Sequence, residues 1–282
     1  MGARERAFGA IDRLQSLRRL VPVSRIPALV DRKVTRLWSD DDYRLAQERQ
    51  MRFLLEFTER ADEVPALARE FASFSLSRTY LRWHPEVLSN QEIRGIEWLT
   101  TRRDPDRSVV LSFMHHNFYE GLFVSLKRAG APIAVLVSPK VLGPDTPCGL
   151  RQHVRVMRAE NLLVPAVGGL DAIQARLQPG MTMSIASDLP GHTEVSFLGR
   201  RVLSSFGAPV IATRTNSQVV VVTRCRSDDG SSYIQVHQPL EPRDFTDPKE
   251  LLGEILRRHE EAVLAWPEVV EMPRARWGIV DE

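Results

Sequence analysis

The sequence predicts an α/β protein in which a mixed central sheet is flanked by helices and accompanied by an N-terminal helical region. After residue 107, short continuous apolar segments alternate with helical patterns, which is typical of a sheet covered on both faces. Before residue 100, apolar residues recur mainly at three- and four-residue steps, the period of helices. We therefore expect a helical region over 1–100 packed on an α/β core over 101–282, with one structural domain overall.

The helical region contains three recognisable patterns. The first, over 10–21, places apolar residues among arginines, so it predicts a basic amphipathic helix that either packs on the domain or lies on a membrane surface. The second covers about 44–61, and the third covers about 64–80 after an acidic start that ends in Val64-Pro65. Residues 100–107 are a plausible joint to the α/β part.

Six apolar, β-branched segments are the predicted strands of the core. They lie at 108–113, 133–137, 161–164, 181–186, 219–223 and 233–237. The helices expected after or between them lie at 118–129, 149–159, 169–177, 207–216 and 248–265. The last two strands are separated by the Ser-Asp-Asp-Gly turn at 227–230, which predicts a hairpin at the edge of the sheet.

The composition excludes several classes of protein. A hydrophobic fraction of 43% and a charged fraction of 26% are ordinary for a globular chain and argue against disorder. Cys148 and Cys225 are too few for a disulfide framework or a zinc site, so no metal is expected and a reducing cytoplasm is favoured. Neither a long apolar run nor a signal sequence is recognisable, so we expect at most a peripheral contact with the inner face of the cell membrane.

The candidate catalytic cluster directly follows the first core strand, at the end of an α/β sheet where ligands bind. It contains His115, His116, Asn117 and Glu120. Within one helix, His116 and Glu120 would share a face, whereas His115 can meet Glu120 only from the turn before a helix capped by Asn117. A carboxylate that orients an imidazole makes a general base. The structural alternative is a pair of histidines at a helix start beside a surface glutamate.

The segment His115-His-Asn-Phe-Tyr-Glu120 resembles the His-x-x-x-x-Asp/Glu motif of the lysophospholipid acyltransferase superfamily. The wider resemblance is to its bacterial lipid A lauroyl/myristoyl acyltransferases and phosphatidylinositol-mannoside acyltransferases, which often read His-x-Gly-Asn-Trp-Asp/Glu. Further similar segments follow in order: 128–137, 170–180, the strand that ends in Asp188, Glu194-Val-Ser-Phe-Leu-Gly199, 207–212 and 266–277. The resemblance covers roughly 45–277.

The resemblance implies a role for individual residues. It makes His115, rather than His116, the general base, with Glu120 as its partner. The positions that it implies for binding substrate are Glu194, Arg155 or Arg158, Asp188 and His116, and Arg200 and Arg201 are candidates for holding a phosphate. An acyl chain is expected in a groove lined by Phe118, Phe123 and Phe197.

The implied activity is transfer of a fatty acyl group to a hydroxyl of a lipid or glycolipid acceptor, without an acyl-enzyme. The donor would be an acyl-carrier-protein thioester (acyl-ACP) or a coenzyme A thioester (acyl-CoA), and neither a further cofactor nor nucleic acid is expected. Two other functions are compatible with the motif. A hydrolase would use the same pair on water, as a thioesterase does, and a non-catalytic homologue would bind an acyl lipid or a carrier protein.

Overall fold

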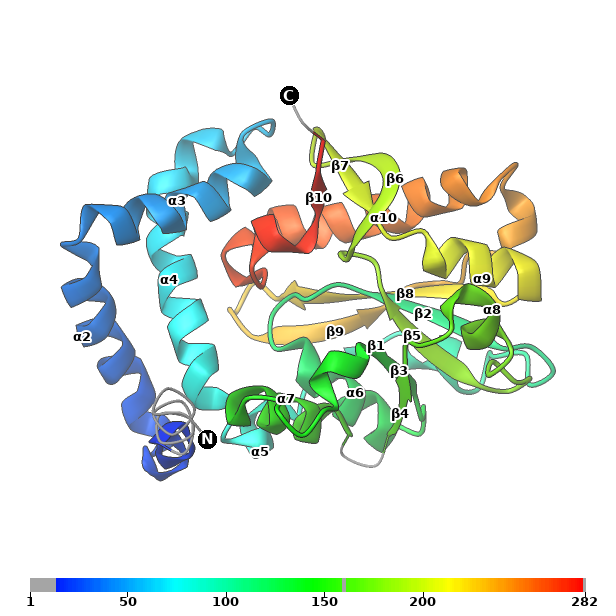
Figure 1. Cartoon of the computed structure of the whole chain (residues 1–282), viewed down its shortest axis with the longest axis horizontal. Coiled ribbons are helices and arrows are strands. Elements are labelled where there is room, and N and C mark those ends of the chain that lie inside the picture. The colour runs from blue at the N-terminus through cyan, green and yellow to red at the C-terminus, as the bar shows by residue number, and fades with distance from the viewer. Residues whose placement is uncertain (1–13, 159–160, 281–282) are drawn as a thin grey trace.

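The structure is a computed structural model that describes residues 14–158 and 161–280. In these ranges the chain is an α/β protein with a seven-stranded mixed sheet flanked by helices (Figure 1). The fold class predicted from the alternating patterns is therefore confirmed. Among the helices of the described ranges, none combines the length and apolar character needed to span a membrane.

The central sheet has the strand order β1-β9-β8-β2-β5-β3-β4. All neighbours in it are parallel except β8 and β9, which form an antiparallel hairpin. Every residue of β2 and β5 is buried, which explains their continuous apolar sequences. The strands are β1 (Glu92–Arg94), β2 (Val109–Phe113), β3 (Ala134–Val137), β4 (Leu162–Pro165), β5 (Thr182–Ala186), β8 (Gln218–Arg226) and β9 (Ser232–Val236).

Helices cover both faces of this sheet (Figure 1). On one face lie α6 (Tyr119–Arg128) and α7 (Cys148–Arg158), and on the other lie α8 (Gly169–Gln174), α9 (Gly207–Thr215) and α10 (Pro248–Ala265). Alternate residues of β2 point to opposite faces of the sheet. Val109 and Leu111 pack with apolar residues of α6, whereas Val110 packs with apolar residues of α9. The sheet is thus buried between two apolar layers.

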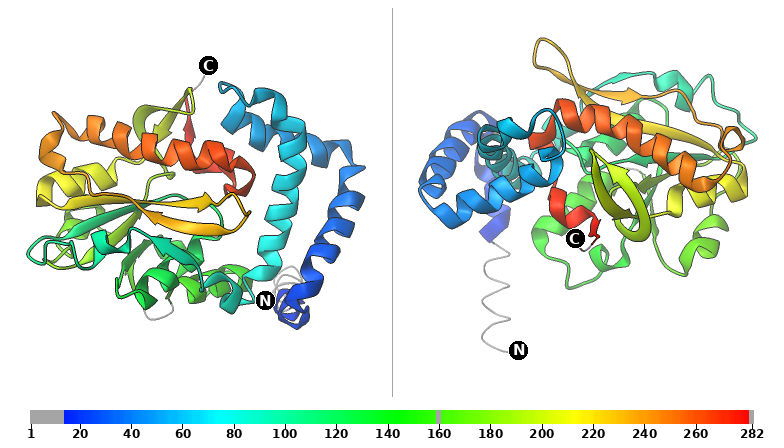
Figure 2. Two further views of the ribbon diagram at one scale, coloured as in Figure 1. Left: turned by 180° about the vertical axis from the view of Figure 1, so that it is seen from behind. Right: turned by 90° about the horizontal axis from the view of Figure 1, so that it is seen from above.

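The N-terminal helices stand beside the sheet rather than on its faces (Figure 2). They are α2 (Ile26–Trp38), α3 (Asp41–Leu55) and α4 (Val64–Leu81), whereas the short α5 (Pro85–Leu88) packs against α6 and α7. A second sheet of order β10-β7-β6 contains β6 (Pro190–Phe197), β7 (Arg200–Ser204) and β10 (Gly278–Ile279). Phe197 and Trp277 stack in one apolar cluster with Met51 of α3 and Phe71 of α4, so this small sheet joins the helical region to the core.

Short 3-10 helices complete the described chain at Ser16–Leu20, Val23–Arg25, Ala61–Glu63, Ile96–Leu99, Pro139–Val141, Pro242–Asp244, Pro267–Val269 and Pro273–Arg276. The amphipathic helix expected over 10–21 lies partly outside the described residues. From its described part, Leu14, Leu17 and Leu20 are 61%, 50% and 69% exposed.

The helix α2 (Ile26–Trp38) was not among the predicted helical patterns, and the structure differs from the prediction in three further respects that concern the sheets. Residues 92–94, expected within the helical region, form β1, and this strand pairs with β9. The β8–β9 hairpin is confirmed, but its position at the sheet edge is wrong because β1 covers it. The small sheet was not predicted, because its strands alternate in burial and give no continuous apolar run. The division at residue 100 stays a prediction.

Gly121 allows α6 to approach the segment after α5 very closely. A Cβ atom at this position would lie 2.0 Å from the Leu88 carbonyl oxygen and 2.8 Å from the Gln91 side-chain nitrogen. Since α6 carries the candidate catalytic segment at its start, this close approach helps to fix where the segment lies. The position tolerates no side chain without movement of the backbone.

We predict that Gly121→Ala lowers the free energy of unfolding by about 1–3 kcal/mol, because the added methyl group forces the two segments apart. Urea unfolding measures this change. Gly253→Ala is the matched control, since Gly253 is exposed on α10 and a Cβ there would meet nothing within 4 Å. The control should be neutral or slightly stabilising, as alanine favours helices. Equal stability of the two variants would contradict the close approach.

Candidate active site

Parallel strand pairing brings His115 and Asp188 together. In the pairing of β2 with β5, Phe113 lies opposite Ala186. His115 and Asp188 each follow these residues by two positions, so both lie just past the carboxyl ends of adjacent strands. The ladder continues past the strands through a hydrogen bond from the Ser187 N–H to the Phe113 carbonyl, at 2.9 Å. The register of the sheet therefore places a histidine beside a carboxylate.

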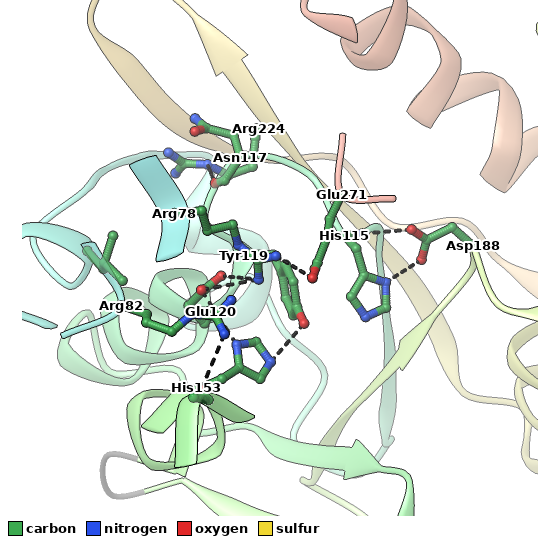
Figure 3. Close-up of polar contacts among 12 residues, drawn as sticks. Arg78, Arg82, His115, Asn117, Tyr119, Glu120, His153, Asp188, Arg224 and Glu271 are labelled. Atoms are coloured by element: carbon green, nitrogen blue, oxygen red, sulfur yellow. Dashed lines mark hydrogen bonds and ion pairs between the residues drawn. The ribbon is translucent and has the colours of Figure 1, made fainter. Parts of the chain in front are cut away.

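The Asp188 carboxylate holds His115 by two hydrogen bonds (Figure 3). Its Oδ1 lies 2.7 Å from His115 Nδ1, and its Oδ2 accepts the His115 backbone N–H at 2.9 Å. Burial opposes ionisation of Asp188, but His115 outweighs it and keeps the pKa of this carboxyl below its usual value. An ionised carboxylate only accepts hydrogen bonds, so Nδ1 carries a proton and Nε2 is left as the basic nitrogen.

The pairing of Glu120 with His115 expected from the motif is wrong. Asn117 and Phe118 have φ of 39° and 50°, so two successive left-handed residues turn the chain before α6 begins at Tyr119. Asn117 is therefore not the N-cap, and the Phe118 position provides no side-chain cap. The turn sends Glu120 away from β5 and toward α4 and α7, whereas the Nδ1 atom of His115 points to the neighbouring strand.

Glu120 belongs to a buried ion cluster centred on Arg78 of α4 (Figure 3). Arg78 Nη2 lies 3.2 and 3.1 Å from the two Glu120 carboxylate oxygens, and its Nη1 pairs with Glu271. Glu271 also pairs with Arg276 at 2.8 Å. Burial disfavours both carboxylates, but the arginines dominate, so the pKa of Glu120 lies well below normal and that of Glu271 is about 2.

The C-terminal segment holds the loop after β2 by backbone hydrogen bonds. The Asn117 N–H donates to the Val269 carbonyl at 2.9 Å, and the Glu271 N–H donates to the His115 carbonyl at 2.8 Å. On the other side of the loop, the buried Arg224 Nε donates to the Asn117 carbonyl at 3.1 Å. The loop over 114–118, the histidine loop, is thus held by hydrogen bonds from its backbone to residues more than 100 positions away.

The His115 ring lies on the wall of a cavity of about 260 Å³. Apolar side chains of β3, α7 and the β5 end form much of its lining, and polar groups converge on the same space. The polar and charged lining residues are Arg82, His115, Tyr119, Ser138, His153, Glu271 and Arg276. The described residues contain no group of three histidine, cysteine or acidic side chains that could hold a metal ion.

A second histidine lies on this cavity, next to Tyr119. The Tyr119 hydroxyl is 2.8 Å from His153 Nε2, and His153 Nδ1 is 3.5 Å from Glu120 Oε1. The Tyr119 ring meets the His115 ring edge to face, with 4.4 Å between the ring centroids. Figure 3 shows the two histidine–carboxylate pairs on either side of Tyr119.

His116 is buried and holds the loop in place rather than facing the cavity. Its Nε2 donates to the Trp266 carbonyl at 2.9 Å, and burial lowers its pKa to about 4, so the ring is neutral. His116 therefore fixes the loop to the C-terminal segment, and within the described chain it is not among the residues that line the His115 cavity.

The remaining predicted residues are also away from this cavity. Glu194 and Arg201 pair with each other at 2.7 Å on the exposed β6–β7 hairpin. Arg200 binds the Phe53 carbonyl at 3.1 Å and pairs with Glu56, so it attaches β7 to α3. Arg155 and Arg158 are exposed on α7. Of the nine predicted site residues, His115 is the one among the described residues that line the cavity. Asp188 does not line it but is hydrogen-bonded to His115.

The residues that sequence reasoning missed come from segments distant from the motif. Arg78, Tyr119, His153, Glu271 and Arg276 all surround the cavity or its ion cluster. Nothing in the spacing of these residues signals their proximity. The expectation that Phe118, Phe123 and Phe197 line an acyl groove is also wrong. Phe123 and Phe197 are 0% and 2% exposed in the core, and Phe118 packs on Phe74. One signal was available for Asp188: it follows its strand at the same offset as His115.

No family model matches the sequence, and the search of curated proteins finds no match. Among solved structures, the chain is similar to the crystal structure of the 1-acyl-sn-glycerophosphate (LPA) acyltransferase PlsC from Thermotoga maritima. The identity is 15% and the TM-score 0.44, over 91% of this chain and 96% of that chain. The lipid A and mannoside branches implied by the motif stay predictions.

We predict that Arg78→Met lowers the free energy of unfolding by about 3–5 kcal/mol at pH 7, because Glu120 and Glu271 lose their shared buried cation. In the native protein both carboxyl groups have depressed pKa values. Their ion pairs therefore stabilise the fold above the unfolded pKa of about 4.3, and this contribution is lost as the pH falls toward about 2, the pKa of Glu271.

In the variant, the buried carboxyl groups take up protons more readily. The loss of unfolding free energy relative to the wild type should therefore be smaller at pH 4 than at pH 7. Urea unfolding at both pH values measures the difference. Arg257→Met is the control, because the Arg257 side chain is 57% exposed and pairs with Glu254 and Glu261 at the surface. It should change stability little. A deficit for Arg78→Met that is independent of pH would contradict the buried ion cluster.

Proposed function

We propose that this protein is an acyltransferase that moves a fatty acyl group from an acyl-ACP or acyl-CoA thioester to a hydroxyl of a lipid or glycolipid acceptor. The observation that carries the proposal is the His115–Asp188 pair, whose basic nitrogen lies at an apolar-walled cavity. The resemblance of the His115 segment to the acyltransferase motif supports the same chemistry. In this proposal the partner of the base is Asp188 rather than Glu120, which is supported by the hydrogen bond between His115 and Asp188.

His115 acts as the general base in this proposal. Its Nε2 takes the proton of the acceptor hydroxyl while the oxygen attacks the thioester carbonyl carbon. The carbon–sulfur bond then breaks, and the thiolate leaves with the proton returned by His115. The products are an ester and a thiol, and no acyl-enzyme forms. Asp188 fixes the tautomer and stabilises the imidazolium that exists between the two proton transfers.

The cavity is suited to the reacting end of such substrates. Ligand pockets usually have volumes of about 300–1,000 Å³, so a cavity of about 260 Å³ holds the reacting groups and the first part of the acyl chain. Val135, Val137 and Met157 provide an apolar wall. Arg82 also lines the cavity, and among the described residues it forms no ion pair with a carboxylate, so its guanidinium is suited to a phosphate of either substrate.

We predict that His115→Ala abolishes transfer and that Asp188→Asn lowers kcat by about 10²–10⁴-fold, because an amide no longer selects the tautomer with a basic Nε2. Thiol release and product formation measure both effects, and circular dichroism checks the fold. His192→Ala is the matched control, since His192 is an exposed histidine on β6. It should retain full activity. Transfer by His115→Ala at the rate of the wild type would exclude the mechanism.

The acceptor can be found by an intact-mass screen with lauroyl- and palmitoyl-ACP and the matching coenzyme A thioesters. LPA, a phosphatidylinositol mannoside and a lipid A precursor are the acceptors to test first. We expect a product whose mass increases by one acyl group and requires His115. Thioester cleavage at the same rate without any acceptor would instead indicate a hydrolase. Binding of the thioester with no turnover would indicate a non-catalytic homologue.

A further inference from the structure

The protonation state of His153 determines which group donates the hydrogen bond between the Tyr119 hydroxyl and His153 Nε2. Glu120 is ionised, and its negative charge favours the His153 tautomer with the proton on Nδ1, the ring nitrogen that lies 3.5 Å from Glu120 Oε1. When His153 is neutral, its Nε2 is therefore an acceptor, and the Tyr119 hydroxyl donates to it across 2.8 Å. In that state Tyr119 presents lone pairs, rather than a hydrogen, to the cavity.

The opposite direction follows when His153 is protonated. Both ring nitrogens then carry hydrogens, so Nε2 donates to the Tyr119 oxygen and the hydroxyl hydrogen must turn elsewhere. The side chains of Tyr119 and His153 both line the cavity, which gives that hydrogen a place to point. A charge on His153 thus converts Tyr119 from an acceptor into a donor toward the cavity.

Packing fixes the position of the Tyr119 oxygen. The ring is stacked on Phe113 with 5.7 Å between centroids, meets His115 edge to face, and lies 5.2 Å from the Arg78 guanidinium carbon. Tyr119 is 5% exposed, and burial, with the nearby Glu271, raises its pKa well above the usual value. The phenol therefore stays neutral and keeps its hydrogen. A fixed neutral donor beside the base suits stabilisation of a developing negative oxygen.

We propose that Tyr119 donates the hydrogen bond that stabilises the acyl carbonyl oxygen as it becomes negative, and that protonated His153 turns this hydrogen toward the cavity. The inference rests on the proposed acyl transfer. Tyr119 is then a catalytic residue, whereas His153 and Glu120 are positioning residues that act through it. The site contains two histidines with different tasks: His115 works as a neutral base and His153 as a cation.

The charged and titratable groups around His153 come from several elements. The Glu120 carboxylate lies 3.5 Å from His153 Nδ1, and Arg82 Nη1 donates to the Gly149 carbonyl of α7 at 3.3 Å. The others that face the same space or the same ion cluster are Arg78, His115, Tyr119, Glu271 and Arg276, and Arg151 and Arg155 lie on α7 itself. The rate should rise as His115 loses its proton and fall as His153 loses its proton.

The first test needs no substrate. Histidine ¹⁵N NMR of the full chain between pH 5 and pH 9 shows which nitrogen of each ring keeps its proton, and the spectrum of His153→Gln assigns the His153 signals. We expect Nδ1 of His153 to stay protonated throughout, while Nε2 loses its proton as the pH rises. A neutral form protonated on Nε2 would overturn the inference, because Tyr119 would then receive a hydrogen bond at every pH.

The second test uses palmitoyl-CoA, or palmitoyl-ACP, with the acceptor identified in the mass screen. Tyr119→Phe keeps the ring and removes the hydroxyl, so kcat should fall about 10²–10³-fold while KM changes little. His153→Gln supplies an amide donor to Tyr119 at every pH. It should keep kcat within about tenfold of the wild type and abolish the alkaline fall in rate, whereas His153→Leu should resemble Tyr119→Phe.

The outcomes separate this inference from the proposed function. Wild-type kcat in Tyr119→Phe would overturn the role of Tyr119, and an unchanged alkaline fall in His153→Gln would overturn the role of His153. Both results would leave the His115 mechanism in place. Activity in His115→Ala would instead overturn the proposed function. A failure to fold is recognised by circular dichroism, and rescue by Gln but not Leu at His153 distinguishes positioning of a hydrogen from simple packing.

Discussion

The buried guanidinium of Arg78 joins three parts of the chain that are far apart in sequence. It extends from α4 of the helical region, contacts Glu120 at the start of α6, and contacts Glu271 of the C-terminal segment. A buried cation with two carboxylates is stable only when every partner is present, since a missing partner leaves an uncompensated charge in the core. The helical region, the histidine loop and the C-terminal segment therefore depend on one another.

The ion cluster of Arg78 also explains why His115 and Glu120, only five residues apart, do not contact each other. Glu120 is occupied by Arg78 and approaches His153, so it cannot orient His115. Asp188, at the end of the adjacent parallel strand, takes that role instead. Each histidine on the cavity thus has its own carboxylate, and Tyr119 lies between them. In the proposed mechanism, these different environments allow a base and a hydrogen-bond donor to coexist in one site.

The histidine loop is constrained from outside as well as by its own turn. Asn117 and Phe118 adopt left-handed conformations that cost energy in residues other than glycine. Backbone hydrogen bonds to Val269 and Glu271, together with Arg224, hold the loop in this shape. Since the strain is offset by contacts that form only in the folded protein, the segment cannot be understood from its local sequence.

The sequence by itself determined the class of fold, most of the core elements and the identity of His115 as the candidate base. Apolar runs and their spacing are local properties, so β2, β5, α6 and α10 were predictable. The partner of His115 was decided by the tertiary structure, because the register of β2 with β5 sets which carboxylate meets it. The same holds for Arg78, Glu271 and His153. The contacts of Arg78 with Glu120 and Glu271, and of His153 with Glu120, cross between 33 and 193 positions of sequence. No local pattern records which distant charges folding brings together.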